Sequence, residues 1–395
     1  MPIKNAPRKI KKAPVKKRSS REKKVSTAKK PVRRTRVVRG KKAAPRSRST
    51  AKHSALRLAK FHRNPIIAPS DHPWESRATF NPGALEKDGR VHLLYRAIGD
   101  RDISVLGYAA SADGLHVDKQ LDAPAYSPTE IFEGTAKQKA AGSWATYNSG
   151  GGTYGGCEDP RLVKIGDRIY LTYTAYDGWS APRVAISSIS EEDFLKHKWS
   201  WESPVIISPP NEAHKNWVLF PEKINGKYAI LHSLCPRILI EYLDDLDFDG
   251  KTYIRSVYGG APQKNRWDSR TRGAGPPPIK TEDGWLVLYH AIDDRDPGKY
   301  KLGAMLLDLN DPTRIIYRAS QPLLEPDQHY ENSGFKAGVV YSCGAVIKDA
   351  ELLVYYGGSD SVVCVATANL RTFLDELKRS GTPEIHPQNF PQLKK

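Results

Sequence analysis

Long apolar runs and closely spaced cysteines are both missing from this 395-residue sequence. No stretch approaches the roughly 20 apolar residues of a membrane-spanning helix, and the opening residues lack the apolar segment of a secretory signal. The four cysteines lie far apart with no Cys-x-x-Cys pair, which argues against a disulfide framework and a structural zinc site. We therefore expect a cytoplasmic protein with no membrane span and with reduced thiols.

Acidic and aromatic residues are almost absent from residues 1–60. This stretch holds 24 Lys and Arg against the single acid Glu22, a charge of +23, whereas the remainder of the chain carries −5. Such a composition cannot bury enough apolar area to offset the entropy of ordering, so we predict a disordered tail over residues 1–60. A polycation binds phosphate backbones by counterion release, so non-specific nucleic acid or an anionic surface is a candidate partner of the tail. A plain solvated extension is favoured over a dedicated nucleic-acid function.

From Phe61 onward, one pattern of a tight turn followed by an alternating strand recurs. Five copies occur, with turns at 88–89, 166–167, 225–226, 283–284 and 349–350. Asn-Gly and Asp-Gly turns favour hairpins, because both central residues can take positive φ. The sequence therefore predicts an all-β domain over residues 61–395, with one helix near Leu370–Arg379.

The spacing of these repeats favours a particular β architecture. The turns lie 58 to 78 residues apart, which fits one small antiparallel sheet for each copy. Sheets of this size close radially around a central channel, so we predict a five-bladed β-propeller. Two β-sandwich domains are the alternative, but no Pro/Ser-rich linker divides the chain.

Four of the five repeated strands end on a polar residue: Arg96, Thr174, His232 and His290. A propeller brings equivalent positions of its blades to the axis, so these side chains are expected to converge. Together they indicate a site for an anionic or sugar ligand. Taken singly, each is explained as well by a surface cation or a satisfied polar group.

The motif GGCEDPRL, which precedes the second repeated strand, holds a candidate acid. Pro160 restricts Asp159 to extended conformations, so its carboxylate is expected to be aimed, although a turn Asp that bonds backbone amides is equally compatible. Arg161, Arg183 and Lys223 are candidate cations for a phosphate or carboxylate, or members of ordinary salt bridges.

Eight motifs in one order give the sequence a family resemblance. They are FNPGA (80–84), LLYR (93–96), GCEDPRL (156–162), YTAYDG (173–178), LFPEKINGKY (219–228), GAGPPPIKT (273–281), LGAMLLDLNDP (302–312) and CGAV (343–346). In this set the chain resembles glycoside hydrolase family 130, which consists chiefly of β-mannoside phosphorylases on five-bladed propellers. The resemblance runs from about residue 64 to 369.

The resemblance implies roles for individual residues. Asp159 is implied as the general acid, which protonates the glycosidic oxygen through the 3-hydroxyl of the mannosyl unit. The implied ligand contacts are Arg183, Lys223 and His290 for phosphate and Asn81, Arg96 and Asp308 for sugar. The implied reaction is the cleavage of β-mannosides, expected to be β-1,4-mannooligosaccharides, by inorganic phosphate with inversion to α-mannose 1-phosphate.

No cofactor is expected, because the sequence has no Walker loop, no GxGxxG after a strand and no HExxH, and no metal is required. The expected partners are an oligosaccharide, inorganic phosphate as co-substrate and, since members of the family often self-associate, a second copy of the chain. Two alternatives stay open. One is a hydrolase of the same fold in which Glu158, Glu222 or Asp177 activates water, and the other is a non-catalytic sugar-binding propeller with a nucleic-acid-binding tail.

Overall fold

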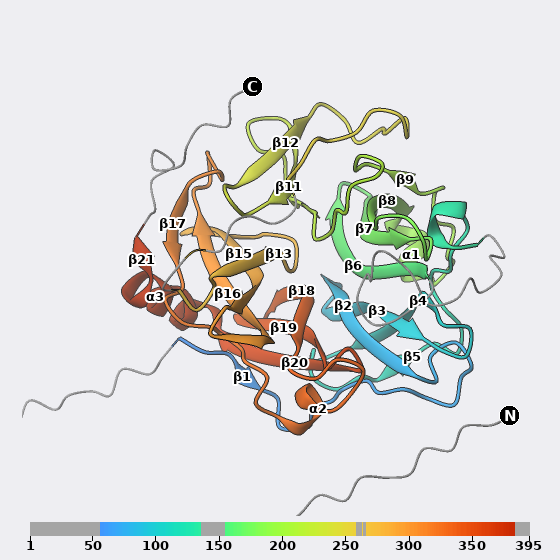
Figure 1. The fold of residues 1–395 in the computed structure, drawn as a ribbon, viewed down its shortest axis with the longest axis horizontal. Coiled ribbons are helices and arrows are strands. Elements are labelled where there is room, and N and C mark those ends of the chain that lie inside the picture. The colour runs from blue at the N-terminus through green and yellow to red at the C-terminus, as the bar shows by residue number, and fades with distance from the viewer. Residues whose placement is uncertain (1–55, 136–154, 258–262, 264–265, 384–395) are drawn as a thin grey trace, which may run out of the picture. The chain divides into compact units, whose positions relative to one another are not determined.

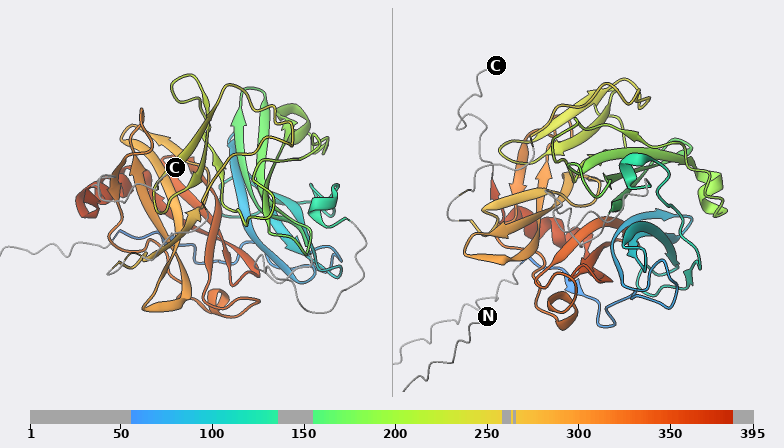
Figure 2. Two further views of the ribbon diagram at one scale, coloured as in Figure 1. Left: turned by 45° about the horizontal axis from the view of Figure 1, so that its top comes forward. Right: turned by 45° about the vertical axis from the view of Figure 1, so that its right-hand side comes forward.

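Strands dominate the structure, a computed structural model that describes residues 56–135, 155–257, 263 and 266–383. This confirms the all-β expectation for the folded region. In Figure 1 the sheets follow one another in chain order around a common centre, and Figure 2 shows the same succession from two further sides. Residues 1–55 of the predicted tail lie outside the described residues.

The largest sheet has the strand order β2-β3-β4-β6-β7-β8-β9, with β5 beside β4. Its strands are β2 (Ala78–Lys87), β3 (Arg90–Ile98), β4 (Ile103–Ser111), β5 (Lys119–Gln120), β6 (Gly155–Ile165), β7 (Arg168–Tyr176), β8 (Arg183–Ser190) and β9 (Val205–Ile206). All neighbours are antiparallel except β4 and β6, which run parallel over two residue pairs. The sheet thus consists of two antiparallel meanders, β2–β5 and β6–β9, joined by a short parallel contact.

The remaining described strands form three antiparallel sheets. One contains β10 (Val218–Leu219), β11 (Tyr228–Ser233) and β12 (Leu239–Leu243). The next contains β13 (Arg270–Ala274), β14 (Ile279–Thr281), β15 (Gly284–Asp293), β16 (Asp296–Leu307), β17 (Ile315–Arg318) and β21 (Thr382–Pro383). The last contains β1 (Ala59–Lys60), β18 (Val340–Lys348), β19 (Glu351–Gly358) and β20 (Val362–Asn369).

The five predicted turns each connect two antiparallel strands, so the predicted hairpins are confirmed. The hairpins are β2–β3, β6–β7, β10–β11, β14–β15 and β18–β19. In the β10–β11 turn, Asn225 and Gly226 have φ of 51° and 81°, the positive values that this kind of tight turn needs.

Several strand pairs change register at a β-bulge or irregularity, and four of these shifts lie in strands near the candidate site. They lie in β2, β6, β13 and β18, at residues 81–82, 159–160, 272 and 343. In β2 and β6 the bulge is an Asn-Pro or Asp-Pro pair, and proline has no N–H to continue the ladder. A bulge bends its strand and re-aims a side chain out of the regular alternation.

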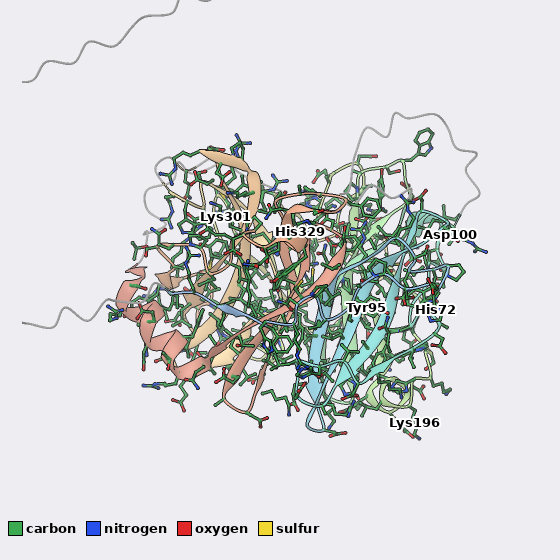
Figure 3. All side chains as sticks on the ribbon, turned by 90° about the horizontal axis from the view of Figure 1, so that it is seen from below. His72, Tyr95, Asp100, Lys196, Lys301 and His329 are labelled. Atoms are coloured by element: carbon green, nitrogen blue, oxygen red, sulfur yellow. The ribbon has the colours of Figure 1, made fainter. Side chains whose placement is uncertain are left out.

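Apolar cores lie between successive groups of strands. Separate buried clusters join β3 and β4 to β6 and β7, β6 and β8 to β10 and β11, and β11 to β15 and β16. Two more join β15 and β16 to β19 and β20, and β19 and β20 back to β3. Figure 3 shows side chains filling the space between the sheets, with Tyr95 of β3 fully buried in the last of these clusters. The chain of cores therefore returns to the sheet where it began.

Helical segments are short in the described residues. They are the 3-10 helix η1 (Ile131–Glu133), α1 (Glu191–Leu195), α2 (His329–Asn332) and α3 (Leu370–Ser380). The last is the predicted helix, which is confirmed. Its N-cap Asn369 accepts a hydrogen bond from the Thr372 amide, and it buries Phe373, Leu374 and Leu377. No helix in the described part of the chain is long and apolar enough to cross a membrane.

The folded region begins before residue 61, so the predicted tail boundary is wrong at its end. Leu56 and Leu58 are buried in the core, and β1 pairs with β20 through Ala59 and Thr367. These two leucines alternate with basic residues, so that the leucine side chains are buried while the charged neighbour Arg57 stays exposed. Residues 56–60 therefore belong to the β-sheet region.

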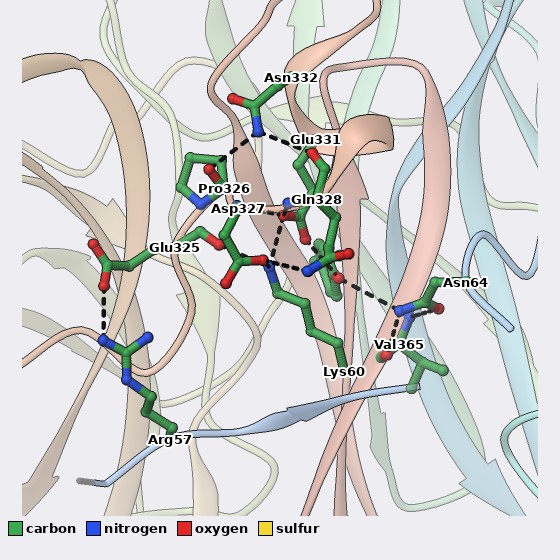
Figure 4. Close-up of polar contacts among 11 residues, drawn as sticks. Arg57, Lys60, Asn64, Glu325, Pro326, Asp327, Gln328, Glu331, Asn332 and Val365 are labelled. Carbon is green, nitrogen blue, oxygen red and sulfur yellow. Dashed lines mark hydrogen bonds and ion pairs between the residues drawn. The ribbon is translucent and has the colours of Figure 1, made fainter. Parts of the chain in front are cut away.

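A buried ion pair fastens this first strand (Figure 4). The Nζ of Lys60 lies 2.6 Å from Oε2 of Glu331, whose side chain is fully buried. Glu331 also accepts a hydrogen bond from the hydroxyl of Tyr356 at 2.9 Å. The neighbouring pair of Arg57 and Glu325 is more exposed, with 49% and 27% of the two side chains accessible. Burial makes the Lys60–Glu331 pair costly to break.

Replacing Lys60 by Met should lower the free energy of unfolding by about 3 kcal/mol, because it leaves the Glu331 carboxylate buried without its cation. The matched variant Arg57→Met breaks the exposed pair and should cost less than about 1 kcal/mol. Urea unfolding followed by circular dichroism measures both. Equal small losses would contradict a stabilising role for the buried pair.

Candidate active site

The carboxylate of Asp159 lies on the β6 bulge, with only 4% of the residue accessible. Its φ of 55° is left-handed, so the predicted extended conformation is wrong; the bulge between Glu158 and Arg161 turns the backbone here. Asn81, with φ of 47° on the β2 bulge, donates from Nδ2 to Oδ1 of Asp159 at 2.8 Å. A Cβ at Gly83 would lie 2.7 Å from the Pro160 carbonyl oxygen, so the glycine lets the two bulges meet.

Arg96 provides the nearest positive charge. Its Nη2 donates to Oε1 of Glu158 at 2.9 Å, and its Nη1 lies 3.4 Å from Oδ1 of Asp159. The guanidinium also lies over the ring of Phe80, 4.7 Å from the centroid. The structure therefore brings three of the predicted site residues, Asn81, Arg96 and Asp159, into one buried cluster.

Arg161 is fully buried beside the acid, but its donors are already engaged. Nε donates to the Gly275 carbonyl at 2.8 Å, Nη1 to the Asp159 carbonyl at 2.7 Å and Nη2 to Oδ1 of Asn216 at 2.9 Å. This guanidinium joins segments before β10 and after β13 to β6. Its donors are thus directed at oxygens of the protein itself.

The charges around Asp159 control its ionisation. Burial alone would raise the pKa of this carboxyl, but the positive charges of Arg96, Lys215 and Arg161 and the hydrogen bond from Asn81 lower it below its ordinary value. Asp159 is thus a carboxylate at neutral pH in the protein alone.

Lys215 is a site cation that sequence reasoning missed. Its Nζ lies 3.6 Å from Oε2 of Glu158, and 12% of its side chain is accessible. The following residue, Asn216, has φ of 66° just before β10, much as Asn81 and Asp159 have positive φ on their bulges. Lys215, which is next to Asn216, therefore lies close to the acid. Lys223, seven residues after Asn216, does not.

Lys215 also forms part of the wall of a cleft with about 320 Å³ of space, some of it open to solvent. The polar side chains of His232 and Arg272 line the same cleft. Burial, and then the nearby charge of His214, lowers the pKa of His232 to about 4, so this imidazole is neutral at pH 7. The cleft thus offers two cations and a neutral imidazole. Asp159 is not one of its lining residues, but the charge of Lys215 in its wall acts on the Asp159 carboxylate.

His290, a predicted phosphate ligand, is completely buried. Its Nε2 accepts a hydrogen bond from the Ser342 amide at 3.0 Å, and its ring stacks on Tyr341 with centroids 3.8 Å apart. Burial and the charge of Arg161 lower the pKa of His290 to about 3. It is a neutral, packed imidazole rather than a cation facing the cleft.

Arg183 lies at the start of β8, opposite Ala175. Its Nη2 donates to the Ser208 carbonyl at 2.8 Å, and its guanidinium lies over the ring of Tyr253. Its charge contributes to lowering the pKa of His214, the residue before Lys215. Arg183 therefore lies near the segment that carries Lys215. Its Nη2, however, donates to a backbone carbonyl.

Lys223 and Asp308 lie away from the buried cluster. Lys223 is exposed in the β10–β11 connection, with Nζ 4.2 Å from the centroid of the Tyr228 ring. Asp308 accepts hydrogen bonds from the amides of Asn310 and Asp311 and so caps the turn before β17. Both side chains lie in turns, whereas Asp159 lies on a bulge at the opposite end of its strand. The structure therefore does not bring either of them to Asp159.

The three carboxylates considered as water-activating bases have other partners. Glu158 is paired with Arg96 and Lys215. Glu222 is exposed and paired with Lys280, and Asp177 accepts hydrogen bonds from two amides of its own loop. None of the three therefore has the geometry of a free base facing the acid.

Asp360 is a second buried acid that sequence reasoning missed. It lies in the β19–β20 turn with 6% of the residue accessible. Burial, opposed by the charges of Lys336 and Arg96, raises its pKa to about 6. A Cβ at Gly357 would lie 2.2 Å from Oδ1 of Asn81, so β19 packs directly on the acid cluster. Nothing in the local sequence signals this burial.

The described residues contain no group of three His, Cys, Asp or Glu side chains that could hold a metal ion. The candidate site offers carboxylates, cations and neutral imidazoles. A buried, positioned carboxylate beside a cation-lined cleft is the arrangement of an acid catalyst acting on a polar or anionic ligand.

Comparison with known proteins gives the family. The sequence model of a family described as β-1,4-mannooligosaccharide phosphorylase matches residues 48–379. The chain belongs to this family, glycoside hydrolase family 130, as its motifs predicted.

Characterised relatives carry phosphorylase names. A 1,2-β-oligomannan phosphorylase of Thermoanaerobacter sp. shares 37% identity over 327 residues, covering 80% of this chain and 98% of the relative. A β-1,4-mannooligosaccharide phosphorylase of Ruminococcus albus shares 29% identity, covering 81% and 90%. The solved structure of β-1,2-mannobiose phosphorylase from Listeria innocua in complex with β-1,2-mannobiose has a TM-score of 0.62 and 26% identity, covering 82% and 99%.

The raised pKa of Asp360 predicts a pH-dependent stability. Between its ordinary value of 3.8 and its folded value of about 6, the folded protein keeps a proton that the unfolded chain has lost, so stability falls as pH rises through this window. From pH 4 to 7, wild-type unfolding free energy should fall by about 2 kcal/mol relative to Asp360→Asn.

Chemical denaturation at a series of pH values measures this difference. Asp308→Asn is the matched control, because hydrogen bonds from the Asp311 and Asn310 amides lower the pKa of Asp308 and reverse the sign. Parallel stability profiles of the wild type and Asp360→Asn would contradict the prediction.

Proposed function

We propose that this chain is an inverting phosphorylase that cleaves β-mannosides with inorganic phosphate and releases α-mannose 1-phosphate. The observation that carries the proposal is the Asp159 carboxylate, held on a bulge by Asn81 and Arg96 beside a cleft lined by Lys215 and Arg272. Family membership and the phosphorylase names of the relatives support it.

A single acid suffices for this reaction. An inverting hydrolase needs a second carboxylate to activate water, whereas phosphate attacks the anomeric carbon as a ready-made anion. Lys215 and Arg272 would hold that anion and reduce its repulsion from the sugar oxygens. Asp159 would supply the proton for the departing oxygen.

Phosphate binding also accounts for how Asp159 obtains its proton. The pKa of Asp159 is lowered by three cations, including Lys215. A phosphate bound to Lys215 offsets that positive charge and places negative charge near the carboxylate, which raises its pKa. Phosphate binding would thus favour the protonated form of the acid in addition to supplying the nucleophile.

The linkage is proposed from the relatives. The sequence alone suggested β-1,4-mannooligosaccharides, but the relative named for β-1,2 linkages is 37% identical and the one named for β-1,4 linkages is 29% identical. We therefore propose β-1,2-linked mannosides as the first substrates to test, with β-1,4-linked mannosides as the second.

The scaffold is proposed to be a five-bladed β-propeller. The four hydrogen-bonded sheets become five blades when the largest is divided at its short parallel contact between β4 and β6. The succession of apolar cores, which returns from β19 and β20 to β3, supports this division. The catalytic domain then begins near Leu56, with the basic segment before it.

The purified protein should release mannose 1-phosphate from β-1,2-mannobiose, or from β-1,4-mannobiose, only when inorganic phosphate is present. Anion-exchange chromatography of the products, with and without phosphate, measures this. Asp159→Asn should lower the rate by at least about a hundredfold, because it removes the general acid. Free mannose released without phosphate would establish a hydrolase instead.

Lys223, a phosphate ligand expected from the sequence, and Lys215, which lines the cleft, provide a matched pair of variants. Lys215→Met should raise the KM for phosphate by about tenfold to a hundredfold, the cost of losing one charge-assisted hydrogen bond. Lys223→Met should leave this KM unchanged, because Lys223 is exposed on the β10–β11 turn. Initial rates at varied phosphate concentration test both, and the reverse ranking would contradict the assignment.

A further inference from the structure

Trp179 is an exposed aromatic side chain that is not part of any buried core cluster among the described residues. It lies in the loop between β7 and β8, and 46% of the residue is accessible. Four other tryptophans, at 74, 201, 267 and 285, donate their indole N–H to backbone carbonyls. Within the described residues, no acceptor takes the indole N–H of Trp179 or that of the buried Trp217. Trp179 is the exposed one of these two, so its ring and its N–H face solvent in the described part of the chain.

The loop that carries Trp179 lies at the rim of the candidate active site. Tyr176, just before the loop, pairs with Gly156, three residues before Asp159. At the other end of the loop, the Pro182 carbonyl accepts a hydrogen bond at 2.9 Å from the amide of His214, the residue before Lys215. The loop thus runs along the rim from β6, which carries Asp159, to the segment that carries Lys215.

The loop also has a fixed shape. Oδ1 of Asp177 accepts hydrogen bonds from the amides of Trp179 at 2.8 Å and Ser180 at 2.7 Å. This side-chain-capped turn holds the backbone under the indole, so presenting Trp179 costs little conformational entropy on binding. Its place at the rim of the candidate site, rather than its exposure alone, suits this side chain to contact a ligand.

The chemistry of the indole selects that ligand. The C–H face of a pyranose ring packs on an aromatic face, and its hydroxyls accept from the indole N–H; large aromatic side chains with one polar atom suit such amphipathic partners. We propose that Trp179 forms a sugar-binding subsite, which stacks on a pyranose ring beyond the cleaved bond. This inference rests on the proposed function and specifies it further, because it makes oligosaccharides better substrates than disaccharides.

Replacing Trp179 by Ala tests the subsite. For a β-mannotriose or longer substrate, kcat/KM should fall by about tenfold, whereas for the disaccharide it should fall less than about threefold, because the stacking partner is absent from the shorter substrate. Trp179→Phe should recover most of the loss. Isothermal titration of each variant with β-mannotriose should show the same ranking without turnover.

Phe335→Ala is the matched control. Phe335 is 48% exposed, close to the value for Trp179, but it packs under the Arg77 guanidinium in the segment between α2 and β18. This variant should keep the wild-type dependence on chain length. Equal chain-length dependence in Trp179→Ala and the wild type would overturn the subsite.

The outcomes separate this inference from the proposed function. If the wild type cleaves or binds mannooligosaccharides and Trp179→Ala behaves identically, the subsite is wrong and the function stands. If the wild type hydrolyses mannosides without phosphate but Trp179→Ala loses the preference for longer chains, the subsite stands and the phosphorylase is wrong. If the wild type neither binds nor cleaves them, both are wrong.

Discussion

The buried guanidinium of Arg161 is the interaction on which the site depends. A cation removed from water costs several kcal/mol unless its donors are satisfied, and here they bond the carbonyls of Asp159 and Gly275 and the side chain of Asn216. The same group therefore fixes the backbone of the acid and the segment that carries Lys215. Acid and cation cannot shift independently, which is the preorganisation that electrostatic catalysis requires.

The sequence predicted those parts of the molecule that local rules determine. Turn residues such as Asn225-Gly226 and the alternation of the following strands were enough to predict the hairpins, because the chemistry of a tight turn acts within four residues. The acid Asp159 and its neighbours Asn81 and Arg96 could be found from motifs. The structure brings these three side chains together, and the motifs of Asn81 and Asp159 also contain the bulges that carry them.

The remaining site residues depend on long-range geometry. Lys215 precedes the motif LFPEKINGKY and Lys223 lies within it, and only the three-dimensional position of each lysine shows which one lies near the acid. Asp360 becomes a buried acid because β19 packs on the Asn81 bulge, a contact between residues far apart in sequence. Likewise, β1 is a two-residue strand in a basic stretch, and its pairing with β20 has no local signal.

The pairing of β1 with β20 has a consequence for synthesis of the protein. Hairpins built from neighbouring residues can form one after another as the chain leaves the ribosome, whereas Ala59 has to wait for Thr367. Until then the last sheet lacks its edge strand, and Glu331 lacks the ammonium group that neutralises it. Closing the contact between β1 and β20 therefore joins residues from opposite ends of the folded region, the kind of non-local pairing that slows folding.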